Sequence, residues 1–187
     1  MKAVKTDLYL IIHGCPQNAA DLIPKNKHWT GWLEQKLRES GLNAYAPDMP
    51  VPWEPDYEKW KKEIDKYEIT TNSLLIGHSC GAAFLVRWLL STSKKVRKLI
   101  LVAPAKTSIQ ENRKKSFYNF DLPKEASKIA AEIVMFISND HENMLESFEL
   151  YKEALSPKVV KLENKKHFIP FQMNTNEFPE LLKEALE

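Results

Sequence analysis

One stretch decides the fold of this chain: Leu74-Leu75-Ile76-Gly77-His78-Ser79-Cys80-Gly81-Ala82-Ala83. It begins as a short apolar run, which predicts a buried strand, and it continues after Gly81 as an apolar stretch with helical spacing. Between the two lies Gly-His-Ser-Cys-Gly, a pattern typical of a sharp strand-to-helix turn that exposes its serine as a nucleophile. Side chains two positions before and after that serine would collide, so glycine is required at Gly77 and Gly81. The sequence therefore predicts that Ser79 is presented at the end of a strand.

Strand and helix patterns alternate along the whole chain on both sides of this turn. Apolar runs predict strands at residues 6–12, 42–46, 73–76, 97–103, 132–137 and 159–162. Amphipathic patterns predict helices at residues 29–40, 55–67, 80–90, 142–155 and 178–186. Such alternation is typical of an α/β fold with a mostly parallel sheet. We expect a doubly wound three-layer sandwich with a six-stranded sheet, in one domain over residues 1–187.

Composition and charge limit the classes of function. The 187 residues are 43% hydrophobic and 28% charged, with a net charge of +2, which are ordinary values for a soluble globular protein. Lysines are scattered among glutamates, so we expect no nucleic-acid partner. No apolar run is long enough to span a bilayer, and the amino terminus lacks a signal peptide. Two cysteines without metal-ligand spacing indicate a reducing compartment, and the cytoplasm is the expected location.

A serine nucleophile needs a base, and the base needs an acid that orients it. Because chemistry in such a fold gathers at the carboxyl ends of the strands, the candidates are polar residues that follow strands. Asp140 follows the fifth predicted strand, and His167 lies in the loop after the sixth. They complete a triad in the chain order serine, acid, histidine. A structural role stays open for each, as a helix N-cap for Asp140 and as a surface residue for His167.

The other histidines are expected to have different roles. His141 would point away from the proposed acid, and His78 packs beneath the turn, too near the serine in sequence to swing onto it. His13 is expected to fix the loop after the first strand. His28 precedes a helix and is expected on the surface.

Acyl transfer also requires two N–H groups directed at the developing oxyanion. Cys80, the residue after the nucleophile, supplies one, and the loop His13-Gly14-Cys15 is expected to supply the Cys15 N–H, with Gly14 as the alternative. The two cysteine Cα atoms would then lie near the range of about 4.4–6.8 Å that a disulfide tolerates. We hypothesise that oxidation couples them and distorts the oxyanion hole. The alternative is two buried, inert thiols.

Several short segments, which keep their order over nearly the whole chain, match one known family. They are His13-Gly14, His28-Trp29 with Trp32-Leu33, Pro47-Asp48-Met49-Pro50, Gly77-His78-Ser79-Cys80-Gly81, Ser138-Asn139-Asp140 and His167-Phe168. In these segments the sequence resembles the small serine hydrolases of the retinoblastoma-binding protein nine and YdeN type, within the α/β-hydrolases. The resemblance implies a compact hydrolase with little or no lid, no cofactor or metal, and the triad Ser79, Asp140 and His167. Cys80 stands where that family commonly has a second serine, and Lys166 stands where a glycine usually precedes the histidine.

The expected substrate is a small molecule with an uncharged acyl group. Apolar candidates for the walls of its site, each with packing in the core or on the surface as the alternative, are Trp53, Phe117, Tyr118, Phe120 and Phe168. Nothing resembles a carboxylate clamp or a phosphate loop, so we predict a short-chain carboxylester or a small activated amide. A non-catalytic protein-binding module on the same scaffold stays open, because fold alone does not fix function. A nicotinamide-dependent enzyme is excluded, since no Gly-x-Gly-x-x-Gly follows the first strand.

Overall fold

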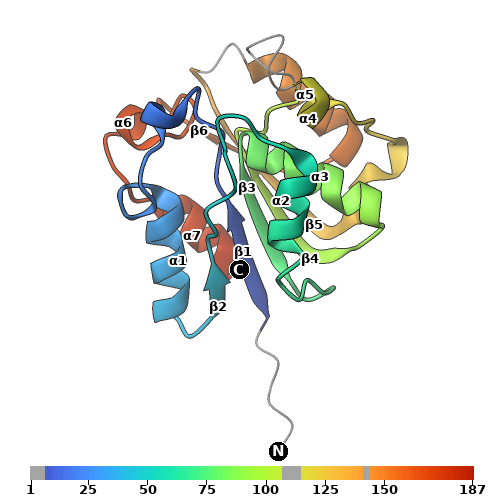
Figure 1. Ribbon diagram of the computed structural model, residues 1–187, viewed down its shortest axis with the longest axis horizontal. Coiled ribbons are helices and arrows are strands. Elements are labelled where there is room, and N and C mark those ends of the chain that lie inside the picture. Colours follow the sequence, from blue (N-terminus) through green and yellow to red (C-terminus); the bar gives the residue numbers. More distant parts are fainter. Residues whose placement is uncertain (1–6, 107–114, 141–143) are drawn as a thin grey trace, which may run out of the picture.

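A computed structural model describes residues 7–106, 115–140 and 144–187. Six strands form one sheet in the order β2-β1-β3-β4-β5-β6, and all of their pairings are parallel (Figure 1). The strands are β1 (Leu8–Ile12), β2 (Asn43–Tyr45), β3 (Leu74–His78), β4 (Val96–Val102), β5 (Ala130–Ser138) and β6 (Lys158–Leu162). The predicted α/β class with a six-stranded parallel sheet is confirmed.

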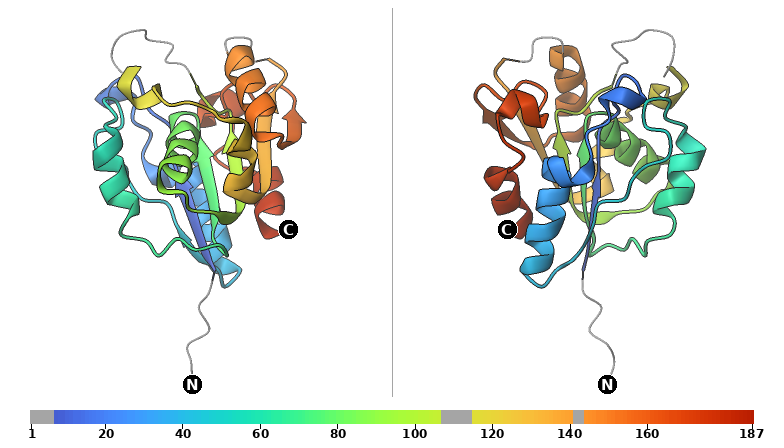
Figure 2. Two further views of the ribbon diagram at one scale, coloured as in Figure 1. Left: turned by 90° about the vertical axis from the view of Figure 1, so that its right-hand side faces the viewer. Right: turned by 60° about the vertical axis from the view of Figure 1, so that its left-hand side comes forward.

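Helices cover both faces of the sheet. Figure 2 shows α1 and α7 on one side and α2 and α3 on the other. The α-helices are α1 (Trp29–Glu39), α2 (Tyr57–Ile64), α3 (Cys80–Thr92), α4 (Lys115–Tyr118), α5 (Leu145–Leu155), α6 (Pro170–Met173) and α7 (Pro179–Leu186). Short 3-10 helices occupy η1 (Ala19–Asp21), η2 (Lys25–Lys27) and η3 (Lys124–Ile129). Across the described ranges, no helix is both long and apolar enough to cross a membrane.

The continuous apolar runs of the sequence are explained by burial on both faces of the sheet. Along β1, Leu8, Leu10 and Ile12 pack in the core formed with α2, α3 and α5. Tyr9 and Ile11 point to the other face and pack with α1 and α7. Because successive side chains of a strand alternate between faces, a strand covered on both sides needs apolar residues at every position.

Helix boundaries follow local capping chemistry. After α1, Gly41 has φ +80° and its N–H donates to Arg38, while Leu42 N–H donates to the Leu37 carbonyl at 3.0 Å. This is the Schellman arrangement that the glycine predicted. The expected helix at residues 55–67 instead begins at Tyr57, because the Asp56 side chain accepts a hydrogen bond from Lys59 N–H and caps the helix.

Candidate active site

Ser79 joins β3 to α3 in a backbone conformation that residues with side chains rarely adopt, with φ 53° and ψ −116°. A Cβ at Gly77 would lie 2.6 Å from the Cα of Ala82. A Cβ at Gly81 would lie 2.5 Å from the carbonyl oxygen of His13. Both contacts are with backbone, which cannot give way, so the predicted need for the two glycines is confirmed.

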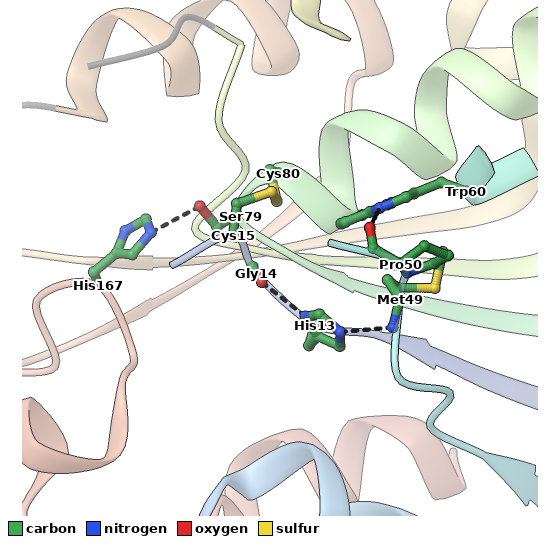
Figure 3. The surroundings of a disulfide bond; sticks show 9 residues. All are labelled: His13, Gly14, Cys15, Met49, Pro50, Trp60, Ser79, Cys80 and His167. Carbon is green, nitrogen blue, oxygen red and sulfur yellow. Dashed lines mark hydrogen bonds between the residues drawn. A yellow bond between two sulfur atoms is a disulfide. The ribbon is translucent and has the colours of Figure 1, made fainter. Parts of the chain in front are cut away.

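The imidazole of His167 lies against this serine. Its Nε2 is 2.8 Å from Ser79 Oγ (Figure 3). The ring comes from the loop after β6, and the serine comes from the end of β3, as the sheet rule for carboxyl ends predicts. A hydroxyl in hydrogen-bond contact with an imidazole is the arrangement that activates a serine nucleophile.

Three side chains form hydrogen bonds with the backbone of His167 and Phe168. His78 Nε2 donates to the carbonyl of His167 at 2.8 Å, and Trp29 Nε1 donates to the carbonyl of Phe168 at 2.7 Å. Gln172 Oε1 accepts from the His167 N–H at 2.8 Å. His78 is buried beneath the turn, as predicted, but its bond to a loop 89 positions away was missed, because no local sequence pattern records such a contact.

Asp140 follows β5 and is bonded to the same loop. Its Oδ1 accepts hydrogen bonds from Ser138 Oγ and from Lys166 N–H, the latter at 2.9 Å. The bond from Ser138 is the main cause that lowers the pKa of the Asp140 carboxyl, so this side chain is an anion at neutral pH. No hydrogen bond within the described ranges joins it to the His167 ring. The N-cap of α5 is Met144. The helix start at residue 142 that Asp140 was alternatively expected to cap lies outside the described residues, as does His141. The role of Asp140 as the triad acid stays a prediction.

The loop after β1 is fixed by His13, as predicted. Its Nε2 accepts from Met49 N–H at 3.0 Å, so the proton of the neutral ring is on Nδ1, which donates to the Gly14 carbonyl at 2.7 Å (Figure 3). A trans peptide points its C=O and its N–H in opposite directions. Holding the Gly14 carbonyl therefore also sets the direction of the Cys15 N–H.

The two expected oxyanion donors belong to residues that are covalently joined. Cys15 and Cys80 form a disulfide, with their Cα atoms 5.8 Å apart (Figure 3). Cys80 opens α3, where an N–H has no acceptor within the helix. Neither backbone N–H donates to an acceptor in the described part of the chain.

The disulfide confirms that the two cysteine backbones approach each other, and the alternative of two free thiols is wrong. The expectation of a reducing compartment relied on two cysteines without metal-ligand spacing, and their pairing in a disulfide removes that ground. The Ser79–His167 hydrogen bond is present together with the disulfide. Distortion of the oxyanion hole by the disulfide stays a prediction.

A cavity of about 910 Å³ adjoins Ser79 and His167. Of the aromatic residues expected in its walls, Tyr118 lines it. Burial of this side chain raises the pKa of its hydroxyl far above the usual value. Among the described residues, no group of three or more His, Cys, Asp or Glu side chains is placed to hold a metal ion.

The other wall predictions are wrong. Phe117 is buried, with its ring 5.1 Å from that of Trp60, and Phe168 is buried and stacked on Phe178 at 5.4 Å. Both belong to the hydrophobic cores on the two faces of the sheet. The half-buried Trp53 and Phe120 also lie outside the cavity lining. A phenylalanine near a strand end can line a cavity or pack in the core, and its contacts with other helices and strands decide which.

His28 is the clearest correction. It was expected on the surface, but it is only 8% exposed and lines the cavity. It is the N-cap of α1, where its Nδ1 accepts from Thr30 N–H at 3.2 Å. Burial, with a smaller contribution from His13, lowers the pKa of His28 to about 4. The place of His28 at the start of a helix was readable from the sequence, whereas its burial involves residues distant in the sequence, among them His78 with its ring 5.9 Å away.

Comparison with known proteins gives matches over most of the chain. The family model described as serine hydrolase matches residues 9–183. The YdeN protein of Bacillus subtilis is 32% identical over 97 residues, so the match spans 50% of this chain and only 48% of that protein. The crystal structure of YdeN has a TM-score of 0.79 at 20% identity and covers 97% of both chains. Est1E from Butyrivibrio proteoclasticus, solved with ferulic acid bound, has a TM-score of 0.64 at 13% identity, covering 97% of this chain and 90% of its own. At these identities the two structures indicate the fold alone.

Cleavage of the disulfide is expected to destabilise the protein. It joins residues 65 positions apart, and a cross-link over a loop of this size stabilises a domain by about 2–4 kcal/mol, chiefly by restricting the unfolded chain. Urea unfolding with and without a phosphine reductant measures the difference. The variant Cys15→Ala with Cys80→Ala is the control, because its unfolding should not respond to the reductant. Identical midpoints for the wild type in both conditions contradict a formed disulfide.

The same two samples test whether the disulfide distorts the oxyanion hole. If it does, the phosphine-reduced protein turns over esters faster per folded molecule than the protein with its disulfide intact. Equal activities would remove that hypothesis.

Acid is expected to destabilise the fold through His28. Its pKa is about 4 in the folded protein and about 6.5 in an unfolded chain. Between these values the unfolded chain binds more protons, so the free energy of unfolding rises with pH through this window, by about 3 kcal/mol at most. Urea unfolding from pH 4.5 to pH 7 measures the slope. His28→Asn, which keeps an N-cap side chain, should flatten it; an unchanged slope argues against a buried neutral ring.

Proposed function

Because the chain belongs to the serine hydrolase family, we propose that it hydrolyses an uncharged carboxylester or activated amide through an acyl-enzyme on Ser79. The observation that carries this proposal is the 2.8 Å hydrogen bond between Ser79 Oγ and His167 Nε2. The serine is held in a strained turn at the edge of a large cavity. A nucleophile, a base and space for a substrate therefore meet at one point.

In the proposed first step, Ser79 Oγ attacks the carbonyl carbon of the substrate while His167 Nε2 takes its proton. The carbonyl oxygen becomes an oxyanion, which accepts hydrogen bonds from the N–H groups of Cys80 and Cys15. His167 then returns the proton to the leaving group as the tetrahedral intermediate collapses. The acyl group stays on Ser79 as an ester.

Water completes the cycle by the same chemistry in reverse. His167 takes a proton from a water molecule, whose oxygen attacks the acyl carbon, and the second oxyanion occupies the same pair of N–H donors. Ser79 leaves with the proton returned from His167. Neither half-reaction requires a metal or an organic cofactor.

We assign the role of the acid to Asp140. Its depressed pKa keeps the carboxyl ionised, and its bond to Lys166 N–H ties it to the residue before His167. A fixed anion at this place favours the imidazolium that forms in each half-reaction. It also holds the loop that carries the base.

Loss of either the nucleophile or the base is expected to abolish most turnover. Ser79→Ala and His167→Ala should each lower kcat on p-nitrophenyl esters by at least about 10³-fold, and the double variant should lose little more, since the pair acts as a unit. Rates on esters of increasing acyl length test this. Ser40→Ala, at the exposed end of α1, is the control with unchanged kinetics. If the wild type hydrolyses no ester in a Ser79-dependent manner, a non-catalytic binding role replaces this proposal.

Removal of the Asp140 charge should be less damaging than loss of the base. We expect Asp140→Asn to lower kcat by roughly 10²–10⁴-fold. Asp56→Asn is the matched control, since it makes the same change at the N-cap of α2 and retains capping. Wild-type kinetics in Asp140→Asn would show that Asp140 is not the acid of the triad.

A further inference from the structure

The cavity is larger than a short acyl group requires. Its volume of about 910 Å³ lies near the upper end of pockets that bind drug-sized ligands, roughly 300–1,000 Å³. It extends from the nucleophile past Gly14 to the start of α1. Apolar side chains from loops and from α6 form much of its wall, among them Leu22, Ile23, Pro24, Ile169 and Phe171.

Within this mostly apolar wall, His28 presents a hydrogen-bond donor. Its Nδ1 accepts from Thr30 N–H and lies 3.2 Å from Thr30 Oγ1. A ring nitrogen that accepts from a backbone N–H carries no proton, so in the neutral ring the proton is on Nε2. No acceptor for this Nε2–H is found in the part of the chain that the structure describes, although the residue is only 8% exposed. Within the described ranges, His28 Nε2 is not one of the fully buried polar atoms that lack a partner, so the atom itself is accessible, and the cavity that the residue lines is the place from which a partner can come.

The ring is uncharged under ordinary conditions. Its lowered pKa, about 4, follows chiefly from burial, and the neighbouring imidazole of His78 lies 5.9 Å away between ring centres. A neutral N–H suits an uncharged acceptor, because it brings no charge to offset the desolvation of a carboxylate. The lysine in the same lining, Lys25, is paired with Glu34 at 2.6 Å. The lining carboxylates Asp21 and Asp48 would repel an anionic ligand.

Among the described residues, no hydrogen bond or ring contact joins His28 to Ser79 or to His167. The ring of His78 contacts both histidines, 5.9 Å from that of His28 and 5.1 Å from that of His167 between ring centres. A substrate with its ester at Ser79 therefore reaches His28 through a part of the molecule beyond the ester.

We propose that His28 is a substrate-binding residue whose Nε2–H donates a hydrogen bond to an uncharged oxygen of the substrate, an ether, hydroxyl or carbonyl, several bonds from the ester that is cleaved. The inference rests on the proposed hydrolase function and defines its substrate class. The substrate is a bulky, largely apolar ester with one distal oxygen, in place of the short-chain ester expected from the sequence.

The test moves one oxygen along a chain of constant length. The probes are p-nitrophenyl octanoate and its analogues in which one ether oxygen replaces each inner methylene in turn. A parallel set places the oxygen in the alcohol of octyl acetate. In the wild type, one isomer should exceed its neighbours in kcat/KM by about 3- to 10-fold, the value of one neutral hydrogen bond. The isomers are compared by the ratio of their rates with the same variant, so a difference in the folded fraction between variants does not affect the result.

Two variants connect that preference to His28. His28→Asn keeps an N-cap side chain with a shorter reach, and His28→Phe keeps the ring volume without a donor. Both should reduce the ratio between isomers to about one, whereas Ser40→Ala, at the exposed end of α1 and outside the cavity, should keep it.

Equal rates for all isomers in the wild type, or a preference that survives in both His28 variants, overturns the inference. Ser79-dependent hydrolysis of octanoate without any oxygen preference rejects the role of His28 alone. No Ser79-dependent hydrolysis of any ester rejects both this role and the proposed function.

Discussion

The backbone of Ser79 is the constraint on which the site depends. Its φ of 53° and ψ of −116° turn the chain directly from β3 into α3 and leave the hydroxyl at the edge of the cavity. The turn exists only because glycine stands at two positions. A Cβ at Gly77 would collide with the start of α3, and a Cβ at Gly81 would collide with the backbone at the end of β1. The close approach at Gly81 also brings the start of α3 beside the loop after β1. The turn therefore places the nucleophile and both expected oxyanion donors together.

The base is held by a second strained segment. Between β6 and α6, Asn164, Lys166 and Phe168 have φ of 56°, 48° and 57°. These values lie in the left-handed region, which costs a residue other than glycine about 1 kcal/mol or more. Glycine adopts the φ of Lys166 without a steric penalty, so a glycine would be favoured at this position. Hydrogen bonds from His78 and Trp29 offset the strain and fix the loop against the sheet.

The order of strands and helices, the serine turn and the positions of Asp140 and His167 were predictable, because each rests on local periodicity or on the rule that parallel strands end at one edge. What failed were several properties set by packing between distant segments. The sequence did not distinguish wall from core for Phe117 and Phe168, nor predict that His28 is buried. It indicated that Cys15 and Cys80 come close, but the oxidised state follows only from the positions of the two sulfur atoms.

The central claim is that the fold activates one hydroxyl. Treatment of the native protein with a fluorophosphonate, followed by peptide mapping by mass spectrometry, tests it directly. The account predicts a single phosphonyl adduct on Ser79 that is absent when the protein is unfolded in urea before treatment. No adduct on the native protein, or an adduct on another residue with Ser79 unmodified, would contradict it.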